Sequence, residues 1–230
     1  LDCLESRGLL EEEYVIRGVK NVKGVIKKGI KNNGSSIFSL ILQSETSTKP
    51  RLYMEYVTLN NGVKMPQLGY GVYQVDPKEC ERCVLDAISS GYRLIDTAQA
   101  YHNEEGVGNA VKKCGVPRED LFIVTKIWIC NAGEEKAYES ILESLRKLQM
   151  DYVDLILIHQ PFGDYYGTYR AMERAYKEGK VRAIGVSNFY PDRFIDLQAH
   201  VEVKPMVNQV ETHVFNQQVE ADEYMKKYGC

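Results

Sequence analysis

The sequence of 230 residues lacks the patterns that mark membrane, secreted and nucleic-acid-binding proteins. It has no run of about 18 apolar residues, which excludes a membrane-spanning helix. Its first residues lack the basic, apolar and small segments of a secretory signal. Lysine and arginine number 29 against 32 acidic residues, so no broad basic surface is available for a nucleic acid. We therefore expect a cytoplasmic protein that binds neither membranes nor nucleic acids.

The six cysteines and four histidines lack the spacing of a disulfide framework or a metal site. Cys80 and Cys83 form one CxxC inside a helical pattern, and neither a second cysteine pair nor an HExxH pattern accompanies it. We interpret them as two ordinary helix cysteines in a reducing compartment. A metal site or a redox pair is the alternative interpretation.

The composition changes near Arg51. Residues 1–52 combine an acidic patch with a lysine-rich stretch at 20–31. We expect an N-terminal extension of unknown role that is poorly ordered or foreign to the fold. The alternative is a surface-binding amphipathic helix around residues 19–30. Residues 53–230 are expected to form the folded domain.

From residue 53 onward, strand and helix patterns alternate. Residues 57–59 and 63–65 flank Asn60-Asn61-Gly62, which predicts a hairpin. Continuous apolar strands such as 155–158 predict a parallel sheet that is covered by helices. The six predicted strands are 68–73, 93–98, 122–128, 155–160, 183–188 and 207–211. The predicted helices are 77–88, 104–113 with Asn103 as N-cap, 134–148, 169–177, 191–200 and 217–227.

Two architectures fit this alternation, an open doubly wound sheet and an eight-stranded barrel. The first strand carries the sequence GYGVY rather than a GxGxxG motif that opens a helix, which disfavours a Rossmann site. Gly106 and Gly108 lie inside a helical pattern and are interpreted as packing contacts. Polar residues end five successive strands: Asp96, Lys126, His159, Ser187 with Asn188, and Gln209 with Glu211. In a parallel barrel these ends form the face that holds the active site.

Tyr101, which follows Asp96 by five residues, completes a set that suits proton donation. The pKa of a tyrosine is near 10, and a neighbouring lysine ammonium lowers it. At about 4 Å the interaction energy of the lysine and the phenolate is roughly 4 kcal/mol. Lowering the tyrosine pKa by about two units requires roughly 2.7 kcal/mol, which is less. Asp96 would keep Lys126 charged, and His159 would hold a carbonyl oxygen. These residues predict reduction of a carbonyl group, with a Schiff-base role for Lys126 as the alternative.

Four segments in this order are similar to the motifs of one enzyme family. They are 91–101 (GYRLIDTAQAY) followed by 103–108 (NEEGVG), 124–128 (VTKIW), 157–161 (LIHQP) and 179–189 (GKVRAIGVSNF). From about residue 56 to the end, the chain resembles the aldo-keto reductase family, in particular its microbial 2,5-diketo-gluconate and aldehyde reductases.

This resemblance implies a (β/α)8 TIM barrel that reduces sugar-derived or small aldehydes and ketones with NADPH. It implies that Tyr101 is the general acid, that Lys126 and Asp96 tune it, and that His159 orients the carbonyl group. The residues implied to bind the nicotinamide carboxamide are Ser187, Asn188 and Gln209. Those implied to line the substrate pocket are His159, Trp128, Tyr73 and Val72.

Only six of the eight barrel strands are recognisable before Cys230. The resemblance therefore implies an incomplete barrel with an N-terminal hairpin, and weak NADPH binding by these residues. If complete, the protein is expected to be a monomer. The alternative function is that of a truncated, catalytically silent relative that acts through protein contacts.

Overall fold

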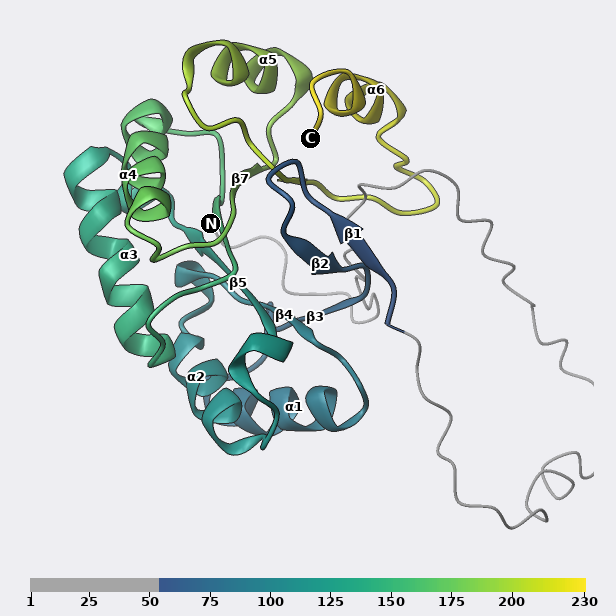
Figure 1. Ribbon diagram of the computed structural model, residues 1–230, viewed down its shortest axis with the longest axis vertical. Coiled ribbons are helices and arrows are strands. Elements are labelled where there is room, and N and C mark those ends of the chain that lie inside the picture. Colours follow the sequence, from purple (N-terminus) through teal and green to yellow (C-terminus); the bar gives the residue numbers. More distant parts are fainter. Residues whose placement is uncertain (1–53) are drawn as a thin grey trace, which may run out of the picture. The chain divides into compact units, whose positions relative to one another are not determined.

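A computed structural model of the chain describes residues 54–230. The extension expected over residues 1–52, and the alternative of an amphipathic helix there, lie outside the described residues. An antiparallel hairpin of β1 (Tyr56–Thr58) and β2 (Lys64–Pro66) precedes a parallel sheet (Figure 1). In the part of the chain that the structure describes, no helix has the length and apolarity needed to cross a membrane.

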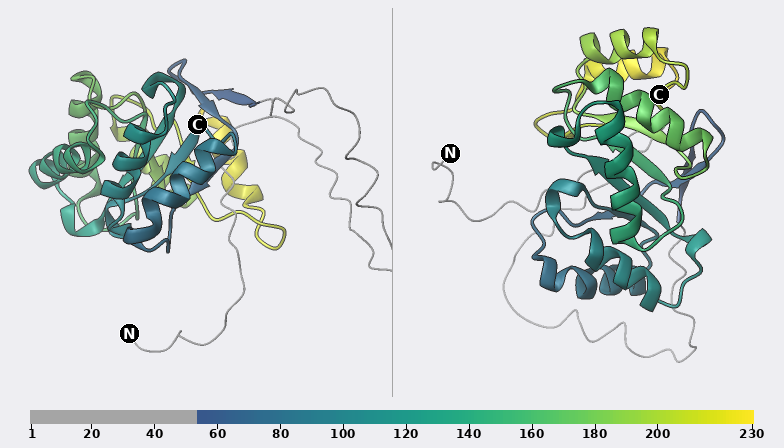
Figure 2. Two further views of the ribbon diagram at one scale, coloured as in Figure 1. Left: turned by 90° about the horizontal axis from the view of Figure 1, so that it is seen from below. Right: turned by 90° about the vertical axis from the view of Figure 1, so that its left-hand side faces the viewer.

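The parallel sheet has six strands whose spatial order follows their order in the sequence. They are β3 (Gly69–Gly71), β4 (Leu94–Asp96), β5 (Phe122–Ile127), β6 (Leu155–Ile158), β7 (Ile184–Ser187) and β8 (Asn208–Gln209). A doubly wound sheet would reverse its strand order at a switch point, and this sheet does not. The sheet curls as part of a barrel (Figure 2), which confirms the predicted architecture.

Six α-helices connect or follow these strands. They are α1 (Pro77–Ser89), α2 (Glu104–Lys113), α3 (Glu134–Leu148), α4 (Tyr165–Lys177), α5 (Pro191–His200) and α6 (Val219–Lys227). Helices α1 to α4 pack side by side in chain order along the outside of the sheet, and α5 packs on α6 (Figure 1). Because the loops that follow the parallel strands all lie at one end of the sheet, this order assembles a common face there.

Helix α4 begins four residues before the predicted start at residue 169. Asp164 is its N-cap, and the carboxylate accepts a hydrogen bond from the Gly167 amide at 2.8 Å. The sequence pattern suggests a break here because Gly163 and Gly167 are poor helix formers. A Cβ atom at Gly167 would nevertheless be crowded, since it would lie 2.9 Å from the Asp164 Cγ atom and 3.0 Å from the backbone nitrogen of Glu134 in α3.

The two glycines of α2 are packing contacts, as predicted. A Cβ atom on Gly106 would lie 2.8 Å from the Cβ atom of Cys80 in α1. One on Gly108 would lie 2.9 Å from the Leu148 Cα atom in α3, and closer still to the Leu148 carbonyl group. Main chain cannot move aside as a flexible side chain can, so α2 and α3 meet at a distance that only glycine permits.

We expect Gly108→Ala to lower the free energy of unfolding by about 1–3 kcal/mol, because the added methyl group forces α2 away from α3. In an unconstrained helix the same change would stabilise the protein by up to about 1 kcal/mol. Urea denaturation measures the difference, with Gly71→Ala as the control, since a Cβ atom on Gly71 meets nothing within 4 Å. A Gly108→Ala variant as stable as the parent would contradict the packing argument.

Candidate active site

The five strand-end positions predicted from the sequence lie at one end of the parallel sheet. Asp96 ends β4, Lys126 is the penultimate residue of β5, and His159 directly follows β6. Ser187 ends β7 and Gln209 ends β8. Since all six strands run parallel, their carboxyl ends, and with them these positions, lie at the same end of the sheet.

Lys126 lies at the centre of this group and is only 1 % exposed. Its ammonium group donates to an Asp96 carboxylate oxygen, to the Thr97 carbonyl oxygen at 3.1 Å and to the Tyr101 hydroxyl oxygen at 3.4 Å. An ammonium group has three protons to donate, and three acceptors surround this one. The pairing stabilises a cation that would otherwise be costly to bury.

The second carboxylate oxygen of Asp96 accepts a hydrogen bond from the Gln209 amide nitrogen at 3.0 Å. These two residues are 113 positions apart in the sequence, and β4 and β8 are not neighbouring strands. The bond therefore crosses the mouth of the curled sheet and links the Lys126 ion pair to the end of β8.

Tyr101 belongs to η1 (Gln99–Tyr101), a short 3-10 turn that follows β4. Its ring centroid lies 5.1 Å from that of Tyr73 and 5.5 Å from that of His159. The ring centroid of Trp128 lies 5.0 Å from that of His159. Two aromatic rings thus contact the histidine, and Tyr73 leaves half of its surface exposed to solvent.

His159 is kept neutral by its surroundings. Burial, together with the Lys126 charge, lowers the pKa of its imidazole to about 4. Its Nδ1 atom is buried and has no hydrogen-bond partner within the described residues. A neutral imidazole carries one N–H group, so at pH 7 this ring can donate a single hydrogen bond without delivering a charge.

The lowered pKa of His159 predicts a loss of stability in mild acid. The ordinary pKa of histidine is 6.5, and that of His159 in the folded protein is about 4. Between these two pH values the imidazole is protonated in the unfolded chain and neutral in the folded protein. Lowering the pH from 7 to 5 should therefore reduce the free energy of unfolding, by on the order of 1 kcal/mol at this partly exposed site. The His159→Gln variant should lack this component when both proteins are denatured with urea at the two pH values.

The control for this experiment is His200→Gln, which changes an exposed histidine on α5. It should retain the pH-dependent loss of the parent protein. If His159→Gln loses as much stability as the parent between pH 7 and pH 5, the lowered pKa is wrong.

Ser187, Asn188 and Gln209 have a donor and acceptor set that fits a carboxamide. The Asn188 amide nitrogen donates to the His159 carbonyl oxygen at 3.2 Å and to the Ser187 hydroxyl oxygen at 3.1 Å. Within residues 54–230 the amide oxygens of Asn188 and Gln209 have no partner, and the Ser187 hydroxyl keeps a proton to donate. Two acceptors and one donor match the two N–H protons and the carbonyl oxygen of a carboxamide.

The residues predicted to line the substrate pocket differ in their exposure to solvent. Trp128 and Tyr73 are partly exposed beside His159 and Tyr101. Val72 is fully buried, and its carbonyl oxygen accepts a hydrogen bond from the Asn103 amide nitrogen at 2.8 Å. Val72 therefore lies below the surface to which Trp128 and Tyr73 contribute.

Two site residues, Gln99 and Asn103, were not recognised from the sequence as supports of Tyr101. Asn103 occupies the N-cap position of α2 as predicted, but its side chain makes no capping hydrogen bond. It accepts from the Thr97 hydroxyl group at 2.8 Å and donates to the Val72 carbonyl oxygen instead. The signal that could have identified both residues is their place on either side of Tyr101 in a turn that has few backbone bonds of its own.

The chain is similar to proteins of one family. The model of the aldo/keto reductase family matches residues 61–230. A glyoxal reductase of Bacillus subtilis is 48% identical over 182 residues, which are 78% of this chain and 66% of that protein. The methylglyoxal reductase DkgA of Escherichia coli is 44% identical over 165 residues, 70% of this chain and 59% of the relative.

Solved structures agree with these relatives. An aldo/keto reductase from Brucella melitensis has a TM-score of 0.75 at 42% identity, over 76% of this chain and 70% of that one. A Bombyx mori aldo-keto reductase in complex with NADP has a TM-score of 0.74 at 33% identity, over 76% of this chain and 64% of that one. The chain spans about two thirds, or less, of the length of the curated relatives it matches.

Proposed function

The chain belongs to the aldo/keto reductase family, and from this premise we propose that it reduces small aldehydes and ketones to alcohols with NADPH. The observation that carries the proposal is the Lys126 ammonium group, held between the Asp96 carboxylate and the Tyr101 hydroxyl oxygen. Relatives named for the reduction of glyoxal and methylglyoxal, and a structural neighbour in complex with NADP, support the choice of substrate and cofactor.

In this proposal Tyr101 is the general acid. A cation 3.4 Å from the phenolic oxygen stabilises the phenolate that remains after the proton has left. Asp96 holds the ammonium group in place and balances its charge. The proton of Tyr101 would pass to the carbonyl oxygen of the substrate as that oxygen becomes an alcohol.

His159 would orient the substrate carbonyl group. Because burial keeps its imidazole neutral, it can donate an N–H hydrogen bond to the carbonyl oxygen while Tyr101 supplies the proton. The Trp128 ring beside it and the Tyr73 ring beside Tyr101 would form an apolar wall for a small substrate. We include Val72 as support for this wall from below.

NADPH, when bound, supplies the hydride. Ser187, Asn188 and Gln209 would hold its carboxamide group and so fix which face of the ring meets the substrate. The hydrogen bond from Gln209 to Asp96 joins this holding site to the residues around the general acid. Movement of Gln209 would therefore disturb Lys126 as well.

The test is NADPH consumption at 340 nm with methylglyoxal, in parallel with NADH and with a titration of NADPH fluorescence. We expect oxidation that depends on both protein and aldehyde and is faster with NADPH. Tight NADPH binding without turnover would favour the silent relative that acts through protein contacts. The absence of both NADPH binding and turnover would contradict the proposal for this chain.

A further inference from the structure

We propose that Gln99 is a positioning residue, which ties the Tyr101 turn to the loop that carries Trp128. Gln99 begins η1, and Trp128 precedes a second 3-10 turn, η3 (Ile129–Asn131). Tyr101, the last residue of η1, and Trp128, the N-cap of η3, both place their rings against His159. The tie is a property of the fold, whereas its effect on catalysis rests on the function proposed above.

The tie consists of one carbonyl oxygen. The Gln99 Oε1 atom accepts hydrogen bonds from the Trp128 backbone amide and from the Asn131 side-chain amide, both at 2.9 Å. The hydrogen bonds from Trp128 and from Asn131 thus end on the same atom. This side chain therefore connects the loop after β5 to the Tyr101 turn.

The amide nitrogen of Gln99 holds the same side chain to a third element. It donates to the Ser140 carbonyl oxygen at 3.2 Å and to the Ser144 hydroxyl oxygen at 3.1 Å, both in α3. All the hydrogen-bonding capacity of the glutamine amide is thus used. Glutamate lacks the two protons to donate, and methionine keeps the length of the side chain without either function.

The two turns do not depend on Gln99 equally. Tyr101 is also held by its contact with Lys126, and its turn is followed by Asn103, whose side chain reaches the Val72 carbonyl oxygen. The Trp128 loop is held by strand β5, which directly precedes it, and by its hydrogen bonds to Gln99. Loss of Gln99 should therefore move Trp128, a predicted substrate-pocket residue, more than it moves Tyr101, the proposed proton donor.

Trp128 is the only tryptophan in the chain, so fluorescence excited selectively at tryptophan, at a wavelength where the 16 tyrosines do not absorb, reports on this loop alone. The experiment compares the parent protein with Gln99→Met, which removes the tie, and Gln99→Glu, which keeps an oxygen facing the Trp128 amide. Gln149→Met is the control, because Gln149 is exposed and its side-chain hydrogen bonds, with Lys112 and Asn109, lie at the surface. Acrylamide quenching of the fluorescence and the kinetics of methylglyoxal reduction are measured for each protein.

We expect Gln99→Met to increase quenching and to lower kcat/KM roughly ten- to hundredfold, as a misplacement of about 1 Å does, with KM changing more than kcat. Gln99→Glu should keep quenching near the parent value and recover part of kcat/KM. Gln149→Met should change neither. If Gln99→Met does not fold, parent-like quenching in Gln99→Glu supports the tie, and increased quenching overturns it.

Unchanged quenching in a folded Gln99→Met variant, even with a lower Tm, would overturn the proposal, because a merely structural role lowers Tm without moving Trp128. Increased quenching with unchanged kinetics would overturn the role in positioning. If the parent protein reduces no aldehyde, the proposed function fails, and the quenching comparison alone still decides whether Gln99 holds the loop.

Discussion

Replacement of Tyr101 by phenylalanine is expected to lower kcat for aldehyde reduction by about 10²- to 10⁴-fold, the range typical of losing a general acid. The change removes one oxygen and keeps the ring, which packs against Tyr73 and His159. Lys126 loses one of its three acceptors but keeps Asp96 and the Thr97 carbonyl oxygen. The ion pair at the centre of the site should therefore survive, and the loss should be one of chemistry rather than of structure.

Three measurements separate these effects in the Tyr101→Phe variant. The rate of NADPH oxidation should fall, the NADPH affinity measured by fluorescence should change little, and urea denaturation should give a stability close to that of the parent protein. Tyr138→Phe is the matched control, because the Tyr138 hydroxyl group binds Glu178 on the exposed side of the helices. A Tyr101→Phe variant that retains the full rate would end the assignment of Tyr101 as the acid.

Periodicity in the sequence predicted the elements of the fold better than it predicted their ends. Helices α2, α3 and α5 begin and end where the pattern placed them, since apolar spacing and flanking glycine or proline agree there. Each observed strand of the parallel sheet is shorter than its predicted range, because the sequence pattern does not show at which residue the backbone pairing between neighbouring strands ends. The start of α4 was missed because a glycine in its first turn is tolerated there, where its amide binds the N-cap Asp164 and the backbone of Glu134 in α3 lies close to it.

The candidate site was predictable to the extent that it depends on strand ends. Parallel strands place Asp96, Lys126 and Gln209 on one face whatever the loops do. Gln99 and Asn103 were missed, because their place beside Tyr101 does not show which backbone and side-chain groups of other elements they bind. Sequence therefore indicates which groups can react, and the structure adds which residues hold them in position.

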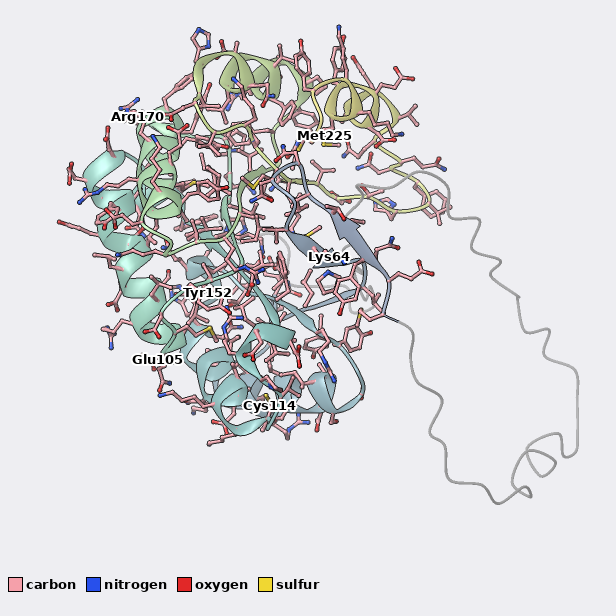
Figure 3. All side chains as sticks on the ribbon, viewed as in Figure 1. Lys64, Glu105, Cys114, Tyr152, Arg170 and Met225 are labelled. Carbon is pink, nitrogen blue, oxygen red and sulfur yellow. The ribbon has the colours of Figure 1, made fainter. Side chains whose placement is uncertain are left out.

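The opposite end of the sheet from the site holds a second buried charge, Asp154, which directly precedes β6 and has no exposed surface. One carboxylate oxygen binds Arg182 at 2.7 Å, and the other binds Arg118 at 2.7 Å and the Ile123 amide at 2.9 Å. Arg118 also donates at 3.0 Å to the backbone carbonyl oxygen of Tyr152, whose side chain is labelled in Figure 3. This carboxylate joins the starts of three neighbouring strands, at the end of a barrel where residues serve stability.

Asp154→Asn should accordingly reduce the free energy of unfolding by about 2–3 kcal/mol and leave kcat/KM of the folded protein unchanged. Breaking a buried ion pair by removing one partner costs about 3–5 kcal/mol. We expect a loss smaller than this range because water can reach the guanidinium groups of Arg118 and Arg182, whose side chains are 21% and 42% exposed. Urea denaturation with an unchanged slope measures the loss.

The matched control is Asp86→Asn, which removes an exposed carboxylate from its pair with Arg82 on α1. Such surface pairs contribute up to about 1 kcal/mol, so the two substitutions of the same chemistry should differ clearly in their effect on stability. Equal losses would mean that Asp154 is hydrated in solution and that the three strand starts are held by apolar packing alone. A loss of kcat/KM in the folded Asp154→Asn protein would instead mean that the two ends of the sheet are coupled, because the site residues lie at the other end of the same strands.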